Sequence, residues 1–198
     1  MKVEIRSDRV HISGYVNAVD RWSRPLTDKE GKRFVEKIVP GTFRRALEEA
    51  EKVDVMLNHD RVLTDTRSGN VTLEEDSIGL HFDGDIYDPS VIESARKREL
   101  RGWSFGFSSP HEQKREDADE PGADYKRTVD GLKLLEVSII DKRKLPAYPA
   151  TSVEVRATED GGEIFVRMEA DGEIETEDRA LEEKNRLYQL RERLRLKK

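Results

Sequence analysis

The first sixteen residues alternate apolar and polar side chains. Val3 and Ile5 are separated by one polar residue, and the same spacing returns at Val10 and Ile12. A period of two is typical of a strand with one buried face. Between these stretches Ser7 and Asp8 are suited to a turn, so the pattern predicts a β-hairpin.

Two short helices are predicted further along. Apolar residues at positions 43, 46, 47 and 50 recur at helical spacing after the break made by Pro40 and Gly41. A second helix is predicted over about 89–99, because Asp88 can cap its N-terminus and Pro89 is tolerated in a first turn.

Most other segments read as short strands, predicted over 53–57, 61–66, 70–74, 79–86, 102–109, 132–140 and 152–156. Asp130 and Gly131 are typical of a two-residue hairpin turn. The charged segment 110–126 contains a Pro-Gly pair and predicts a mobile surface loop. The fold class expected is β-rich α+β, with a closed or nearly closed β-barrel flanked by helices.

Charge is unevenly distributed and suggests a separate tail. Charged residues make up 39% of the 198-residue chain and hydrophobic residues 35%. Residues 159–178 contain nine acidic and one basic residue, a net of −8, whereas 179–198 contain three acidic and eight basic, a net of +5. We therefore expect a folded domain over 1–156 and a charged, partly helical C-terminal tail over 157–198. The leucines at 187, 190 and 194 fit either a helix that binds a partner helix or a solvated helix.

Composition excludes several kinds of function. The chain has no cysteine, which rules out disulfides, a thiolate nucleophile and cysteine-based zinc sites. The four histidines lie in no metal-binding motif, so neither a metal nor another cofactor is expected. A soluble intracellular protein is expected, because no long apolar stretch marks a membrane span. A net charge of −6 makes nucleic acid an improbable partner.

Three residues are candidates for chemistry. His59 stands at a predicted strand end between two polar residues, where a side chain is held by a rigid element yet accessible, although surface histidines in such turns are common. Ser104 alternates with buried aromatics, and Gly106 on the same face leaves space for a substrate backbone. Glu136 points opposite to Leu135 and Val137, either toward a site or simply outward from the sheet. The pattern alone leaves each of these choices open.

In combination the motifs become specific. The sequence VPGTF, MLNHD, SIGLHFDGDI, RGWSFGFSS, LLEVSII and PAYPATSVEVR, in this order over roughly residues 10–156, resembles the caudoviral prohead or head-maturation protease family. The resemblance implies a herpesvirus-protease-like fold and a serine nucleophile activated by histidine. It assigns the histidine to His59, the serine to Ser104 and the third, acidic residue to Glu136. His111 and Asp60 are rivals for the third position, and the oxyanion hole is left unassigned, with Arg143 as a candidate.

The resemblance also implies the biological setting. The expected substrates are the scaffolding protein or scaffolding segment and the major capsid protein, together with the protease itself, inside a prohead assembling in the host bacterial cytoplasm. A homodimer is compatible with it. The alternative in another class is a catalytically inactive, protease-like scaffold or capsid-assembly protein, and a nucleic-acid-binding barrel is a weaker one.

Overall fold

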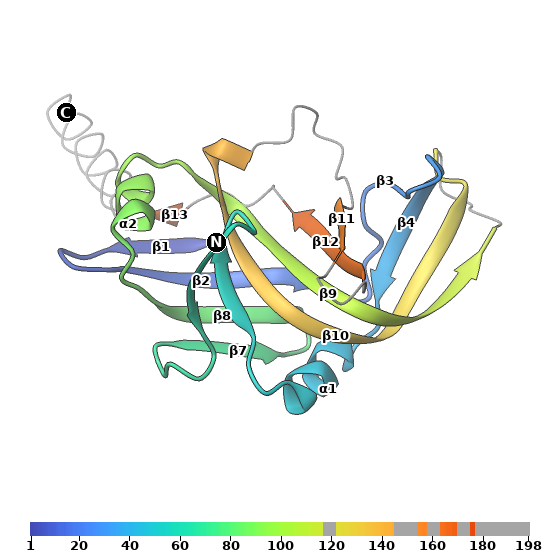
Figure 1. The fold of residues 1–198 in the computed structure, drawn as a ribbon, viewed down its shortest axis with the longest axis horizontal. Coiled ribbons are helices and arrows are strands. Elements are labelled where there is room, and N and C mark those ends of the chain that lie inside the picture. The colour runs from blue at the N-terminus through green and yellow to red at the C-terminus, as the bar shows by residue number, and fades with distance from the viewer. Residues whose placement is uncertain (117–121, 145–153, 158–162, 170–174, 177–198) are drawn as a thin grey trace, which may run out of the picture.

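Two β-sheets and two short α-helices make up the described part of the chain in a computed structural model (Figure 1). The structure describes residues 1–116, 122–144, 154–157, 163–169 and 175–176. The protein is thus α+β and strand-rich, as predicted.

The first sheet has five strands in the order β13-β1-β2-β8-β7. They are β1 (Lys2–Ile5), β2 (Val10–Ala18), β7 (Val71–Glu75), β8 (Gly79–Ile86) and β13 (Glu175–Thr176). β1 and β2 pair antiparallel across the turn at Ser7 and Asp8, which confirms the predicted hairpin.

The second sheet is built on two long antiparallel strands, β9 (Leu100–Arg115) and β10 (Tyr125–Asp141). Its strands follow the order β11-β12-β9-β10-β4-β3, and β5 pairs with both β10 and β6. The remaining strands are β3 (Leu26–Thr27), β4 (Arg33–Ile38), β5 (Asp54–Leu57), β6 (Arg61–Asp65), β11 (Glu154–Ala157) and β12 (Glu163–Glu169). A short 3-10 helix, η1 (Lys142–Lys144), follows β10.

The main core lies where β9 and β10 cross the first sheet (Figure 1). Trp103, Phe105 and Phe107 all point into it, as their alternation predicts, and Trp103 packs on Phe82 of β8 with ring centroids 4.6 Å apart. This packing fixes which face of β9 contacts the aromatic core, so alternate residues such as Ser104 take the opposite face.

Both predicted helices are present. α1 (Thr42–Glu49) buries Phe43 and Ala46 in the core. α2 (Pro89–Arg96) begins as predicted, because the Asp88 side chain accepts hydrogen bonds from the backbone N–H groups of Ser90 and Val91. These bonds satisfy two amides that a helix start leaves unpaired.

Three sequence predictions are wrong. Neither sheet closes into a barrel in the part of the chain that the structure describes. Asp130 and Gly131 form no hairpin turn; they lie within β10, where register shifts around Gly131 mark a bulge that lets the long strand bend. The predicted loop over 110–126 is too long at both ends, because β9 continues to Arg115 and β10 begins at Tyr125. Here the pairing of two long strands outweighed a charged local sequence.

The boundary at residue 156 stays a prediction. Strands β12 and β13 fall within the predicted tail, yet β12 pairs with β9 and β13 pairs with β1. The helix predicted around the three leucines lies outside the described residues.

Candidate active site

β9 and β10 place three polar side chains, two of them candidates from the sequence, on one face of the second sheet. Ser138 is the direct cross-strand partner of Ser104, and Glu136 is the partner of Gly106. Because side chains of paired residues share a face, Ser104, Glu136 and Ser138 lie together on the face opposite the aromatic core. All three are buried, with Ser104 at 0% and Glu136 at 8% exposure.

A tight turn after β5 brings His59 to this face. Asn58 and His59 both adopt the left-handed conformation, with φ of 54° and 60°. Two hydrogen bonds tie the turn to β10: the backbone N–H of Asn58 donates to the carbonyl oxygen of Ile139 (2.9 Å), and that of His59 donates to Oγ of Ser138 (2.8 Å). The parallel pairing of β5 with β10 ends at Leu57 and Ile139, so the turn begins where the ladder stops.

The imidazole of His59 is bound to the carboxylate of Glu136. Its Nδ1 lies 2.6 Å from Oε1, and both side chains are buried. A carboxylate only accepts hydrogen bonds, so Nδ1 carries the proton and donates it. In the neutral ring this leaves the lone pair on Nε2, the form that a general base requires.

Gly106 makes this contact possible. A Cβ at residue 106 would lie 2.7 Å from Oε1 of Glu136 and 2.9 Å from its Cγ, which is closer than real Cβ contacts. The expectation that Gly106 leaves space for a substrate backbone is therefore wrong in this structure. The side chain of Glu136 fills this space and contacts His59 with its carboxylate.

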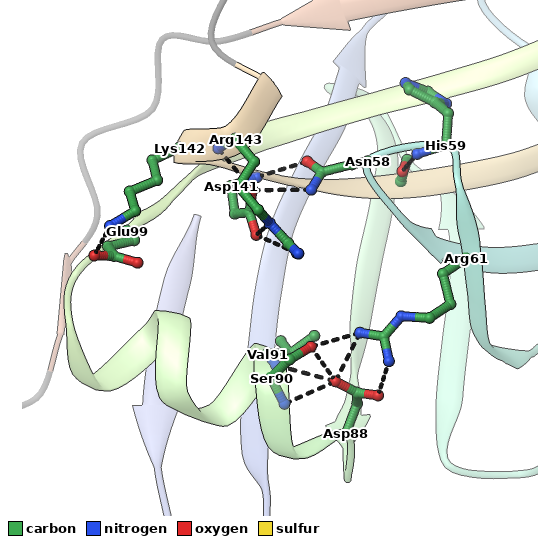
Figure 2. A network of polar contacts seen from close by, with 11 residues as sticks. Asn58, His59, Arg61, Asp88, Ser90, Val91, Glu99, Asp141, Lys142 and Arg143 are labelled. Carbon is green, nitrogen blue, oxygen red and sulfur yellow. Dashed lines mark hydrogen bonds and ion pairs between the residues drawn. The ribbon is translucent and has the colours of Figure 1, made fainter.

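A second set of polar contacts holds the other side of the histidine turn (Figure 2). The Asn58 side-chain amide donates to Asp141 Oδ1 (2.8 Å), and the Asp141 backbone N–H donates back to Asn58 Oδ1 (3.0 Å). Arg143 donates to the same carboxylate from its backbone N–H (2.9 Å) and from Nε (2.8 Å). The end of β10 therefore fixes the residue that immediately precedes His59.

These contacts shift the pKa of Asp141. Burial raises the pKa, but the hydrogen bonds from Arg143 and Asn58 outweigh it and hold the pKa of the carboxyl below its usual value. The pKa of Arg143 is raised in turn, mainly by its hydrogen bond to Asp141. The carboxylate stays charged and keeps its partners.

The strand that follows the turn is joined to α2 (Figure 2). Arg61 donates from Nη1 to Asp88 Oδ2 (2.7 Å) and from Nη2 to Oδ1 (3.0 Å). Burial raises the pKa of Asp88, but hydrogen bonds from Ser90, Arg61 and Val91 lower it overall. The turn carrying His59 thus has a fixed element on each side.

The rival residues lie elsewhere. The side chain of His111 is 77% exposed and bonds to Asp130, and Asp60 is exposed. Arg143 is engaged with Asp141, and its side chain is 58% exposed. Glu136, one of the carboxylates weighed from the sequence, contacts the imidazole of His59.

Sequence reasoning missed three contributors. Ser138 lies on the face of Glu136, and the period-two spacing of 136 and 138 is the signal that could have identified it. Asn58 is a residue type enriched at positive φ. Its partner Asp141 is 83 positions away and left no local signal.

Across the described residues no group of three or more His, Cys, Asp or Glu side chains is arranged to hold a metal ion. Over those same residues no helix has the length and apolarity needed to cross a membrane.

The sequence matches a known protein family. The family model described as caudovirus prohead serine protease matches residues 1–162. No curated protein and no solved structure matches the chain significantly.

Proposed function

The chain belongs to the caudovirus prohead serine protease family, and on that premise we propose that Ser104, His59 and Glu136 form its catalytic triad. The observation that carries the proposal is the 2.6 Å contact between Nδ1 of His59 and Glu136, made on the face of the sheet that also carries Ser104. All three residues lie within the matched range.

In the proposed mechanism Ser104 Oγ attacks the carbonyl carbon of a peptide bond. Nε2 of His59 takes the hydroxyl proton and then gives it to the leaving amine. Glu136 holds the ring in the required tautomer and stabilises the imidazolium that forms. Water then attacks the acyl-enzyme by the same route in reverse, which releases the second product and restores the Ser104 hydroxyl.

The proposed substrates are the scaffolding protein or scaffolding segment and the major capsid protein, with self-cleavage as a further reaction. The site of action is the interior of the assembling prohead. These assignments rest on membership in the family.

Co-expression with the cognate capsid protein tests the proposal. Capsid cleavage should be abolished in Ser104→Ala, because loss of a triad nucleophile lowers turnover by about 10⁶. Ser108→Ala is the matched control, since Ser108 lies on the same strand four residues further along and is only partly buried. Unchanged cleavage in Ser104→Ala would refute the proposed nucleophile.

A fluorophosphonate reporter separates an active enzyme from the alternative, an inactive protease-like assembly protein. Activated Ser104 Oγ would form a bond to phosphorus, fluoride would leave, and His59 would take the proton. Labelling of the wild type but not of Ser104→Ala supports the enzyme. Absence of both labelling and capsid cleavage in the wild type would support the assembly protein.

A further inference from the structure

The strand that carries Ser104 has β10 on one side and β12 on the other. β12 pairs antiparallel with β9 from Trp103 to Phe107, and Met168 is the residue in register with Ser104. The backbone N–H and C=O groups along this edge of β9, immediately around the proposed nucleophile, are therefore used by a segment from near the C-terminal end of the chain.

β12 stands apart from the rest of the site. The family match ends at residue 162, and β12 begins at Glu163. His59, Ser104 and Glu136 all lie within the match. The strand over the edge of β9 is thus an addition to the part of the chain that defines the family. Its sequence, EIFVRME, is rich in β-branched and aromatic residues and suited to an extended strand.

An edge strand is a docking site for extended polypeptide, because its unpaired backbone groups can bind one more strand. The five residues of β9 that β12 covers are centred on Phe105 and include Ser104. An extended peptide on the same edge would cross Ser104 and bring its own backbone carbonyls to that residue. Ser104 is fully buried with β12 in place.

We propose that substrate binds along the edge of β9 and that β12 occupies this same edge within the chain. Substrate must then displace residues 163–169 to reach Ser104. This inference rests on the proposed function. It assigns the C-terminal segment a regulatory role: the enzyme is held closed by its own chain and opens when β12 leaves the edge. It also defines the partner of this edge as an extended polypeptide segment.

Proline substitutions in the full-length chain test the proposal. In Val166→Pro/Arg167→Pro, two neighbouring backbone N–H groups of β12 are removed. Consecutive N–H groups of a strand point to opposite sides, so one of the two faces β9. Val166→Ala/Arg167→Ala is the matched control, because it keeps both N–H groups.

The first readout is independent of catalysis. In the Ser104→Ala background, amide hydrogen exchange over residues 103–107 should be faster in the proline variant than in the alanine control. In each variant the exchange rate over residues 103–107 should be the same at two protein concentrations, because β12 belongs to the same chain as β9. Equal exchange in the two variants, or protection that falls on dilution, would overturn the inference.

The second readout is activity. With Ser104 present, fluorophosphonate labelling should be about tenfold faster in the proline variant if the edge of β9 is free in about a tenth of wild-type molecules. Adding the synthetic peptide EIFVRME should slow labelling of the proline variant again. Suppose that the wild type labels and that the proline variant shows faster exchange but no faster labelling. This result would show that β12 does not compete with substrate for the edge of β9, and it would overturn the inference.

Failure of the proposed function is recognised separately. Neither the wild type nor the proline variant would then label or cleave, although exchange over residues 103–107 still rises in the proline variant. That result would refute the triad and, with it, the regulatory role of β12.

Discussion

The carboxylate of Glu136 lies directly over the Cα of Gly106, in space that no other residue type would leave open. A Cβ at position 106 would come within 2.7 Å of Oε1, the same oxygen that binds His59. The glycine of β9 and the glutamate of β10 are cross-strand partners, so the pairing of the two central strands keeps their backbones side by side. The position of the proposed acid therefore depends on a missing side chain on the neighbouring strand.

Gly106→Ala should inactivate the protein while preserving the fold. The methyl group would push the Glu136 carboxylate away from His59, and a misplacement of about 1 Å can cost about 10²-fold in rate. Fluorophosphonate labelling measures the loss, and circular dichroism checks the fold. Gly131→Ala on β10 is the matched control, because its Cβ would meet only the Cβ of His111 at 3.2 Å, on an exposed residue. Full labelling of Gly106→Ala would show that Glu136 need not occupy this position.

Glu136→Gln should lower turnover strongly with little change in substrate binding. The amide keeps the shape of the side chain, but it removes the charge that stabilises the imidazolium and favours the wrong tautomer of His59. The equivalent change in a serine protease triad costs about 10⁴ in kcat. Steady-state kinetics measure kcat and KM separately. The control is Glu74→Gln, an exposed glutamate on β7, and a mutant kcat equal to that of this control would exclude Glu136 from the triad.

Replacing Asn58 should destabilise the protein. Asn58→Ala leaves the buried Asp141 carboxylate without one of its donors, which costs about 1–3 kcal/mol of unfolding free energy. Asn58→Gly separates this loss from backbone strain, because glycine tolerates the positive φ of residue 58 but cannot make the side-chain bonds. Urea unfolding measures both variants. If Asn58→Gly were as stable as the wild type, the Asn58–Asp141 contact would contribute nothing.

Stability should fall in acid through Asp141. Its pKa in the folded protein is lowered by Arg143 and Asn58 in spite of burial. Its contribution is therefore complete above the unfolded value of about 3.9 and is lost as pH falls through the lower folded value. Urea unfolding between pH 7 and pH 2 should show a shallower acid loss in Asp141→Asn, which is already less stable at neutral pH.

The control for the acid series is Asp8→Asn, whose side chain is 62% exposed in the first hairpin. It should follow the wild-type profile. If Asp141→Asn lost as much stability in acid as the wild type, Asp141 would have no part in the acid sensitivity.

Local sequence predicted the elements well where one short segment contains the whole signal. The cap and first residue of α2, Asp88 and Pro89, are adjacent, and the aromatic alternation at 103–107 directly gives the face of β9 that packs into the aromatic core. Prediction from local sequence failed at Asp130 and Gly131, because the dipeptide that is typical of a hairpin turn also suits a bulge. The choice between the two depended on whether β9 continued far enough to pair on both sides of it.

The family resemblance supplied the proposed site residues, and the tertiary structure supplied their geometry. Nothing near Glu136 in the sequence distinguishes an outward glutamate from a partner of His59, because the two are 77 positions apart. The distinction needed the parallel pairing of β5 with β10, which places the turn of His59 beside the end of β10.

What the sequence determined by itself was both helices, most of the strands and the face on which Ser104 lies, because periodicity and capping act over a few residues. Strands β3, β4, β12 and β13 were not predicted. What only the tertiary structure decided was which side chains meet. Glu136 over Gly106, Asn58 with Asp141, and β12 along the edge of β9 are all contacts between strands distant in sequence. Such contacts form only when packing and hydrogen bonding are satisfied over the whole sheet at once.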